Sequence, residues 1–519
     1  MSVERSRLAR NTLHASVGIY TEYFLGMVAN VIMARQLGPA DFGVYGLLLW
    51  WAVFAQTLIN GGVTLGAIRF IAEQRARGED AASRNVAAHL SWVQSTKLGI
   101  VLLVMVAILP WAIERIVPGA SRLAAGLLLA AIAFRTSYMF YVSVAKGAER
   151  FLAVSRIALI VAPVNLALVA LVGWLAPTVE SFVGVFLVSG ILFCAVSRWQ
   201  VSDLLRGDRR SLGPELKARI RHHLGIVSTN AIVRFVASRE LELLLLGLWF
   251  SMRDAGFFKA GLTVAAGLVL LVPGTFSAVL LPFMARSVTG GNEVAGRRLR
   301  LATQYLVLLA VPLAAYVAAV ADRVIPLLYG DSFAPASVAL MAGTAAAAMV
   351  SIGDAAQSYL LSAQRQWMIL VFTVAGLLLR VLVGVALIHE YGLIGACMSQ
   401  VLVSGLLETA KMIYASRQLK VALPVRHALR VLTASVAAAA AAWVTTREFE
   451  GVVGLGLSVP AFVAVSVAGS ILLRCYSLRD VEGMEAIARR LPGPGGGLVR
   501  NLTRIVRSRR LYLDPSGDV

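Results

Sequence analysis

Long apolar runs separated by short polar connections dominate the chain. A membrane-spanning helix needs about 20 mostly apolar residues. The pattern predicts an all-α polytopic membrane protein with about 14 transmembrane helices. We place them near residues 14–34, 42–62, 88–112, 123–144, 152–175, 181–197, 224–249, 256–280, 301–320, 336–362, 367–388, 393–414, 427–445 and 452–473.

The seventh run departs from this pattern, because Arg234, Arg239, Glu240 and Glu242 lie inside it. A charge at the centre of a span costs roughly 2.5 to 3.5 kcal/mol on insertion scales, so such residues normally face water or a partner. On a helix, Arg234, Arg239 and Glu242 share about half of the circumference. Arg239 and Glu242 are three residues apart and can neutralise each other. Arg234 has no carboxylate at such a spacing, which favours a water-filled cavity.

Composition excludes several classes of protein. The 519 residues are 58% hydrophobic and 15% charged, too apolar for an ordinary soluble enzyme. The net charge of +20 is dispersed between apolar runs rather than gathered on one domain, so we expect no nucleic acid partner. The three cysteines lack metal-ligand spacing, and no Gly-rich nucleotide loop occurs. We expect neither a metal nor a cofactor.

The distribution of Lys and Arg predicts the orientation in the membrane. Basic residues concentrate in alternate connections, and such connections are normally cytoplasmic. An even number of spans then places both termini in the cytoplasm and the protein in the inner (cytoplasmic) cell membrane. The longest basic connection contains Arg206, Arg209, Arg210, Lys217, Arg219 and Arg221.

An internal repeat predicts two lobes. The residues at 41–45 (DFGVY) align with those at 254–258 (DAGFF), and both copies fall at corresponding spans. Parallel repeats are a known transporter plan, with the substrate path between the halves. We therefore predict a first lobe at 1–200 (spans 1–6), a basic linker at 201–223, a second lobe at 224–420 (spans 7–12), two extra spans at 421–475 and a basic cytoplasmic tail at 476–519.

Four short phrases resemble the polysaccharide-export branch of the MOP superfamily, the Wzx-type flippases of lipid-linked oligosaccharides. They are ARQLGPADFGVY at 34–45, KGAERF at 146–151, LYGDSF at 328–333 and YGLIGA at 391–396. Each phrase alone is compatible with a tight turn or a close helix contact, which glycine provides in any membrane protein. Together they span about 360 residues at fitting places.

The resemblance implies a flippase rather than an enzyme. Its substrate would be an isoprenoid-pyrophosphate-linked oligosaccharide, moved to the outer leaflet by alternating access for lipopolysaccharide or exopolysaccharide assembly. The implied partners are that substrate, membrane lipids and other polysaccharide-assembly proteins. The family is described as relying on basic cavity residues without one shared motif, so only position and charge carry over.

Candidate site residues follow from charge inside the spans. Arg binds phosphate oxygens bidentately and stays protonated, whereas Lys acts as a point charge. The predicted substrate-binding residues are Arg234, Arg239, Lys97, Arg135, Lys259 and Arg380. Lys97 and Lys259 can instead extend to the membrane interface. Intramembrane carboxylates suit H⁺ or Na⁺ coupling, and the candidates are Glu22, Glu242 and Asp354. For each carboxylate a hydrogen-bonded helix contact is the alternative.

Two rival functions remain. A MATE-like ion-coupled multidrug exporter shares the superfamily plan but should present a cavity dominated by carboxylates. A membrane glycan polymerase or ligase should carry catalytic groups in a large external loop. The longest external connection predicted here, 321–335, has about fifteen residues.

Overall fold

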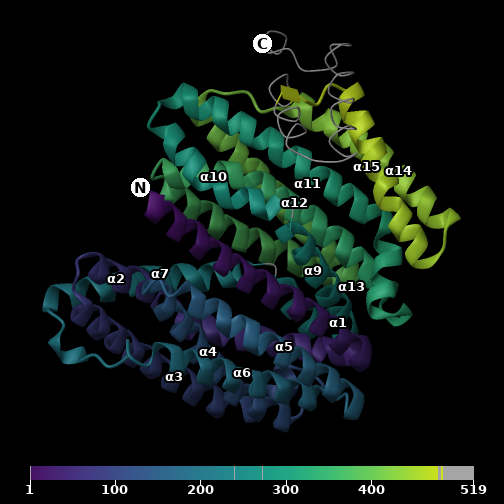
Figure 1. The fold of residues 1–519 in the computed structure, drawn as a ribbon. Coiled ribbons are helices and arrows are strands. Elements are labelled where there is room, and N and C mark those ends of the chain that lie inside the picture. Colours follow the sequence, from purple (N-terminus) through teal and green to yellow (C-terminus); the bar gives the residue numbers. More distant parts are fainter. Residues whose placement is uncertain (1, 239, 272, 477–480, 483–519) are drawn as a thin grey trace. The chain divides into compact units, whose positions relative to one another are not determined.

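The structure is a computed structural model that describes residues 2–238, 240–271, 273–476 and 481–482. Side chains are described for 21–109, 111–238, 241–269, 280–476 and 481–482. Within these residues the chain is helical and contains no strand (Figure 1). The helices are α1 (Ser2–Asn60), α2 (Val63–Ala76), α3 (Asp80–Ile116), α4 (Arg122–Gly147), α5 (Phe151–Leu175), α6 (Val179–Val201), α7 (Pro214–Val236), α8 (Glu240–Trp249), α9 (Met252–Leu271), α10 (Pro273–Val288), α11 (Asn292–Tyr329), α12 (Ala336–Ser362), α13 (Gln366–Leu419), α14 (Val425–Glu448) and α15 (Gly451–Leu472), with short 3-10 turns at Arg209–Ser211 and Asp331–Phe333.

The helices account for the predicted spans. Ten helical segments in the described part of the chain are long and apolar enough to cross a membrane. α1 and α13 each contain two predicted spans, joined where Gly38 (φ 72°) and Gly392 (φ 52°) adopt backbone angles that other residues avoid. The predicted seventh and eighth spans are divided, into α7 with α8 and α9 with α10. The prediction of an all-α protein with about 14 spans is confirmed.

Packing divides the chain into two compact units. The first contains residues 1–263 and 373–399, and the second contains residues 264–372 and 400–519. This division differs from the predicted lobes, since α7, α8 and the first part of α13 pack with the amino-terminal helices. The lobes and the 201–223 linker were inferred from the sequence repeat, and they remain a prediction. The tail beyond Tyr476 lies outside the described residues except at 481–482.

The two copies of the sequence repeat meet within the first unit. Gly43 on α1 and Gly256 on α9 lie against each other, backbone to backbone. A Cβ atom added to Gly43 would overlap the carbonyl of Met252, and one added to Gly256 would overlap the carbonyl of Pro39. Small residues at such positions let helix backbones approach closely. The repeated glycine is therefore explained by this crossing.

Each unit has its own buried core. In the first unit, Phe70, Leu90 and Phe140 belong to a cluster that joins α2, α3, α4 and α7. In the second, Leu299 and Leu360 belong to a cluster between α10, α11, α12 and α13. In the alanine run at 437–442, Ala438 and Ala442 are fully buried where α14 meets α11 and α15.

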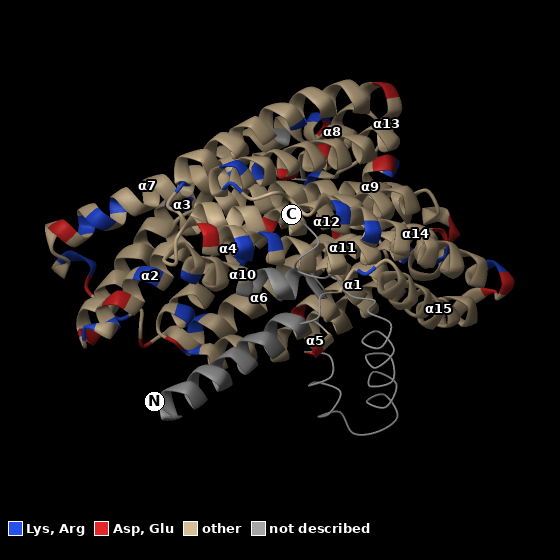
Figure 2. Cartoon of the chain, turned by 90° about the horizontal axis from the view of Figure 1, so that it is seen from above, with Lys and Arg blue, Asp and Glu red and all other residues tan. Residues whose placement is uncertain are grey.

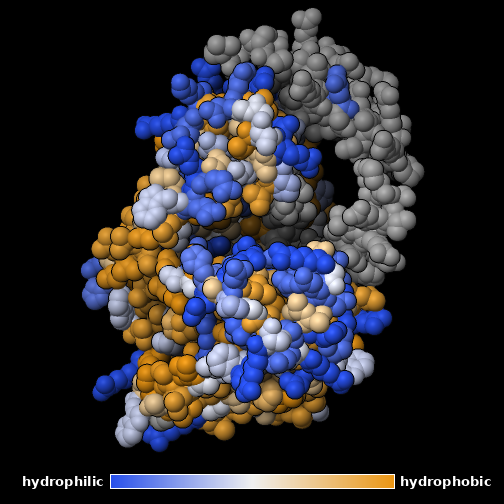
Figure 3. Space-filling view, turned by 90° about the vertical axis from the view of Figure 1, so that its left-hand side faces the viewer, coloured by the Kyte–Doolittle hydropathy of each residue, from blue (hydrophilic) through white to orange (hydrophobic). Residues whose placement is uncertain are grey.

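Charged residues of the first unit gather at the end where α2 and α7 lie. Figure 2 shows Lys and Arg near the labelled ends of these helices, with uncharged residues over the helix centres. The same end is covered by hydrophilic residues in the lower half of Figure 3. It carries the basic connections that the sequence places in the cytoplasm.

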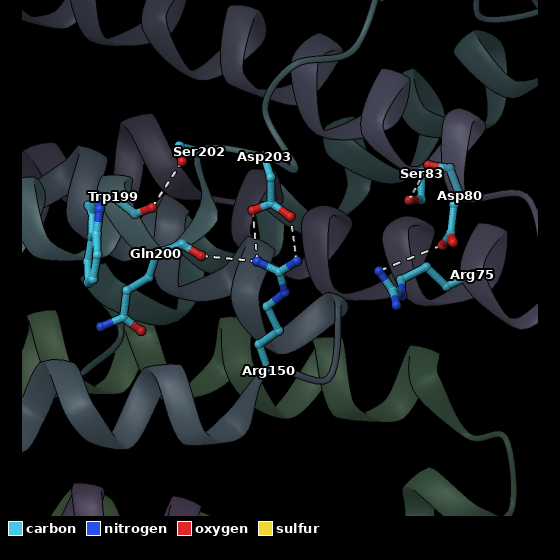
Figure 4. Close-up of polar contacts among 8 residues, drawn as sticks. All are labelled: Arg75, Asp80, Ser83, Arg150, Trp199, Gln200, Ser202 and Asp203. Carbon is cyan, nitrogen blue, oxygen red and sulfur yellow. Dashed lines mark hydrogen bonds and ion pairs between the residues drawn. The ribbon is translucent and has the colours of Figure 1, made fainter.

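Arg150 fastens two connections at this end of the first unit. It follows α4, and it donates hydrogen bonds to the Gln200 carbonyl (3.1 Å) and to both oxygens of Asp203, which follows α6 (Figure 4). Nearby, Arg75 and Asp80 pair at 3.7 Å across the turn between α2 and α3. The KGAERF phrase therefore supplies both a helix contact, at Gly147, and a loop anchor, at Arg150.

The Arg150–Asp203 pair predicts a pH-dependent contribution to stability. Hydrogen bonds from Arg150 hold the pKa of Asp203 below its ordinary value. A depressed carboxyl pKa stabilises the fold above the unfolded value of about 3.9, and this contribution is lost as pH falls through the folded value. The pair is largely exposed, so Asp203→Asn should cost under about 1 kcal/mol at pH 7. Thermal unfolding should show a small difference from wild type at pH 7, and this difference should shrink as the pH falls below about 3.9. A difference that stays equal over this range would contradict this.

Candidate functional site

A large cavity lies within the first unit, among residues that the structure describes. It has a volume of about 620 Å³ and is lined by residues of α1, α2, α4, α6, α7 and α9. Its charged residues are Glu22, Arg135, Lys146 and Lys259. Three cations and one carboxylate give this cavity a basic balance. Phe235 and Lys259 belong to the predicted second lobe, whereas the other lining residues belong to the predicted first lobe.

Arg135 is the central cation of this cavity. It projects from α4 and donates a hydrogen bond to Ser189 Oγ on α6 at 3.0 Å. The guanidinium lies over the ring of Phe186, 4.2 Å from its centroid. Gly190 leaves room for the arginine stem, because a Cβ there would lie 3.2 Å from Arg135 Cγ. The Arg135 Nε atom is buried without a hydrogen-bond partner among the described residues. Arg135 is thus held in place with donor capacity left over.

Glu22 provides the only carboxylate among the described residues that line this cavity. The Tyr138 hydroxyl, one turn after Arg135 on α4, hydrogen-bonds the Glu22 carboxylate. Arg135 and Lys146 are the cations close enough to act on it electrostatically. In the empty cavity, the Glu22 carboxylate is thus the anion that interacts with Arg135 and Lys146. An entering anion would compete with Glu22 for them.

Aromatic rings form another wall. Trp50 stacks on Phe54 with ring centroids 5.5 Å apart, and Phe235 of α7 packs on Trp50 at 5.3 Å. The Lys259 stem lies along Gly46 of α1, since a Cβ at Gly46 would be 3.3 Å from Lys259 Cγ. Aromatic faces suit the apolar faces of sugars as well as cations. The wall therefore adds surface for a polar ligand without adding charge.

A smaller cavity adjoins this one and shares Glu22, Leu49, Arg135 and Phe186 with it. Its volume is about 240 Å³, and Asn30, Tyr45 and Asn165 contribute polar groups to its lining. Arg135 and Glu22 thus stand where the two spaces meet. Both charges therefore line both cavities.

Lys97 lies elsewhere in the first unit. From α3 it donates to the Gly61 carbonyl (3.3 Å) and to Ser228 Oγ on α7 (3.1 Å). Ser228 also donates to the same carbonyl. Lys97 thereby fastens the turn between α1 and α2 to α7, and it is not among the residues that line the two cavities. Its predicted contact with substrate remains a prediction.

Arg234 is exposed in the last turn of α7, directly before the cavity residue Phe235. The described residues contain no carboxylate that pairs with it by hydrogen bond or ion pair. Arg239 lies outside the described residues. Their assignments to the substrate stay predictions.

Arg380 is buried in the first unit as the partner of Glu242. Its Nη1 atom donates to Glu242 Oε1, and the side chains are 7% and 0% exposed. The pair joins α8 to α13 and does not line either cavity. The structure thus places both residues in a contact between helices, which is the alternative considered for Glu242. Neither residue enters the transport mechanism proposed for this protein.

Asp354, on α12 of the second unit, lies near Glu408, which pairs with Lys411 at 2.7 Å. Its coupling role is still a prediction.

Sequence reasoning did not select Lys146 or Tyr138 for the site. The sequence does contain a pattern that includes them, namely residues on one face of α4 at helical spacing. Those that line the cavity are 135, 138, 139, 142, 143 and 146. Lys146 lies just after the predicted fourth span (123–144), so the rule that selects charges within spans did not include it. The aromatic wall gave no such signal, because aromatic residues in a span are equally typical of packing and of lipid contact.

Comparison with solved structures shows the fold. A structure titled "Lipid II flippase MurJ, inward closed conformation" matches with a TM-score of 0.71 and 12% identity over 88% of this chain and 97% of that one. An inward-facing multidrug resistance MATE family transporter of the MOP superfamily matches with a TM-score of 0.62 and 15% identity over 78% and 98%. A MOP superfamily transporter from Pyrococcus furiosus, whose title mentions a reverse polarity of its binding pocket, matches with a TM-score of 0.56 and 13% identity over 80% and 95%. No curated protein sequence gives a match.

Comparison with protein families extends this result to the sequence. The family described as "Polysaccharide biosynthesis protein" matches residues 32–338, more than half of the chain. The match includes α4 and the other helices from which Arg135, Lys146 and Lys259 project. The chain, with its MurJ-like and MATE-like helical fold, belongs to the polysaccharide biosynthesis protein family.

Proposed function

We propose that the protein flips an isoprenoid-pyrophosphate-linked oligosaccharide across the cytoplasmic membrane by alternating access, with both termini in the cytoplasm. The observation that carries this proposal is the cavity of the first unit, where Arg135, Lys146 and Lys259 face a single carboxylate. Membership of a polysaccharide biosynthesis family and a fold shared with a lipid II flippase support it.

The cavity addresses the main physical barrier to such transport. A pyrophosphate and a glycan must cross about 30 Å of hydrocarbon, and an uncompensated charge there costs several kcal/mol or more. Arg135 supplies a fixed guanidinium, and the two lysines supply point charges. Trp50 and Phe235 provide ring faces beside these cations. The isoprenoid tail would remain in the bilayer while the head group crosses.

Glu22 is the group that would couple transport to an ion. Its carboxylate interacts electrostatically with Arg135 and Lys146 when the cavity is empty. A pyrophosphate that binds these two cations must therefore compete with the Glu22 carboxylate for them. Uptake of a proton by Glu22 would remove the resulting repulsion between anions. Substrate binding and protonation would then favour each other.

A MATE-like multidrug exporter is the second candidate, favoured by the shared fold. The polarity of the cavity separates the two functions. Cationic drugs call for carboxylates, whereas the described lining of this cavity contains one carboxylate and three cations. Deleting the gene should therefore leave resistance to cationic dyes unchanged.

The function is tested in cells by depleting the protein. Surface polysaccharide should fall while the lipid-linked precursor accumulates in the inner leaflet, where only a cytoplasmic probe labels it. Re-expression should restore both. Normal surface polysaccharide after depletion, or increased sensitivity to cationic dyes alone, would overturn the proposal.

Arg234 offers a test at a residue that is exposed beside the cavity wall. Arg234→Glu should trap the precursor in the inner leaflet at normal protein abundance, because it replaces a cation next to Phe235 with an anion. Arg234→Lys should retain most of the transport. Unchanged surface polysaccharide in the Arg234→Glu strain would remove Arg234 from the substrate path.

A further inference from the structure

A third cavity lies at the charged end of the first unit, between α2 and α7. Its volume is about 250 Å³, and its lining includes Arg69, Phe70, Arg219, His222, His223 and Ile226. None of its described lining residues lines the two cavities of the proposed transport site. The transport mechanism proposed above therefore leaves this cluster unexplained.

Phe70 organises the cationic groups of this cavity. The ring is almost fully buried, and the guanidinium groups of Arg69 and Arg219 lie 5.3 and 5.8 Å from its centroid. The His223 ring meets it edge-on at 5.4 Å. Arg219 is further held by Glu73, which accepts from its Nη2 atom at 3.1 Å. Two positive charges are thus held beside one small cavity.

His223 contributes a buried donor that lacks an acceptor. Arg69 Nη1 lies 3.3 Å from His223 Nδ1, and because arginine can only donate, Nδ1 is the acceptor. The ring proton of the neutral histidine then sits on Nε2. Burial, and then the charge of Arg69, hold the pKa of His223 below its ordinary value, in agreement with this neutral form. Nε2 is buried and has no hydrogen-bond partner among the described residues. An anionic oxygen would satisfy this N–H group.

The cavity also has an apolar side that is open to the surroundings. Ile226 is 57% exposed on α7, and it stands one helical turn after His222 on the way into the predicted seventh span. Basic groups therefore lie on the side of the predicted cytoplasm, and apolar surface lies toward the predicted bilayer. A ligand with a phosphate group and a hydrocarbon chain matches both parts.

We propose that this cavity binds the phosphate group of an anionic phospholipid of the cytoplasmic leaflet. Arg69 and Arg219 would neutralise the phosphate, and His223 Nε2 would donate to one of its oxygens. The acyl chains would extend past Ile226 along α7. A free phosphate fits the basic groups equally well, but it leaves the exposed apolar side uncovered.

The proposal is tested with the purified full-length protein by titrating phosphatidylglycerol and measuring bound lipid by native mass spectrometry. The double variant R69Q/R219Q should bind phosphatidylglycerol about tenfold more weakly than wild type, as expected for losing charge-assisted hydrogen bonds. Arg209→Gln is the matched control. Arg209 is exposed at the same end and lies over Trp92, 4.9 Å from the ring centroid. Its loss should leave binding unchanged.

The outcomes distinguish a phospholipid from other sources of phosphate. They also distinguish failure of this lipid site from failure of the flippase proposal. Ile226→Ser should weaken binding of phosphatidylglycerol, and this surface variant decides the matter if R69Q/R219Q fails to fold. Equal loss in R69Q/R219Q and Arg209→Gln would mean general attraction to charged lipid and would overturn the site. Inorganic phosphate or an isoprenoid pyrophosphate that displaces phosphatidylglycerol at equal concentration would also overturn it. Lipid binding is measured without transport, so failure of the flippase proposal leaves this result unaffected.

Discussion

Replacing Arg135 with Gln should reduce flipping of the lipid-linked oligosaccharide on the order of 100-fold. Arg135 is the cation that both cavities share, and it is oriented by Ser189 and the ring of Phe186. A charge-assisted hydrogen bond contributes about 1.5 to 3 kcal/mol, and about 1.4 kcal/mol corresponds to a factor of ten, so losing one strong bond to a pyrophosphate accounts for this factor. Arg135→Lys should be intermediate, because it keeps the charge and loses the planar fork. Precursor labelled in the inner leaflet, normalised to protein abundance, measures the effect.

Arg198→Gln is the matched control for this variant. Arg198 also projects from a helix of the first unit, and it donates to an aromatic residue, the Tyr141 hydroxyl, at 2.9 Å. It lines neither cavity. Transport at the wild-type rate in Arg198→Gln with loss in Arg135→Gln would assign the effect to the cavity. Equal losses in both variants would instead indicate a general need for charge in these helices.

Replacing Glu242 with Gln should destabilise the protein by about 3 to 5 kcal/mol, the usual cost of leaving one charge of a buried pair without its partner. The Arg380 side chain is buried, so little water can reach it to take the place of the carboxylate. We expect a large drop in thermal unfolding temperature and in the amount of folded protein in the membrane. Arg380→Met should have a similar effect, since it leaves the carboxylate of Glu242 in the same buried contact.

The double variant Glu242→Leu with Arg380→Met distinguishes pairing from function. Removing both charges replaces an ion pair by apolar packing, which is often neutral or stabilising. We therefore expect the double variant to be more stable than either single variant and to transport normally. If it folds well and yet transports nothing, the pair has a direct role in transport, and the structural assignment is wrong.

Much of the fold could be predicted from the sequence because lipid imposes a strong local rule. Backbone groups in hydrocarbon must be paired within a helix, so each apolar run of about 20 residues becomes a span. The phrases at 34–45 and 391–396 also marked real turns, at Gly38 and Gly392. The division into packing units was not predicted, because it depends on contacts between helices that lie far apart in the chain.

The residues that line the basic cavity were predicted only in part. Charge within a span identified Arg135, Lys259 and Glu22, which the structure brings to one cavity. The same rule selected Arg380 and Glu242, whose partners are each other across α8 and α13. A single sequence shows that a buried charge needs compensation, but it does not show whether the compensation comes from water, substrate or a distant side chain. Lys146 was missed because its position after a span suggested a solvated charge.

The central claim is that the basic cavity moves a pyrophosphate-linked glycan across the bilayer. The most direct measurement is flipping by the purified protein in proteoliposomes that carry a fluorescent isoprenoid pyrophosphate oligosaccharide, with membrane-impermeant quenching as the readout of leaflet position. We predict that wild-type protein makes the inner-leaflet pool accessible, that Arg135→Gln does not, and that a neutral isoprenoid glycoside is not moved. Equal movement of the neutral and the pyrophosphate-linked lipid, or wild-type rates in Arg135→Gln, would contradict this account.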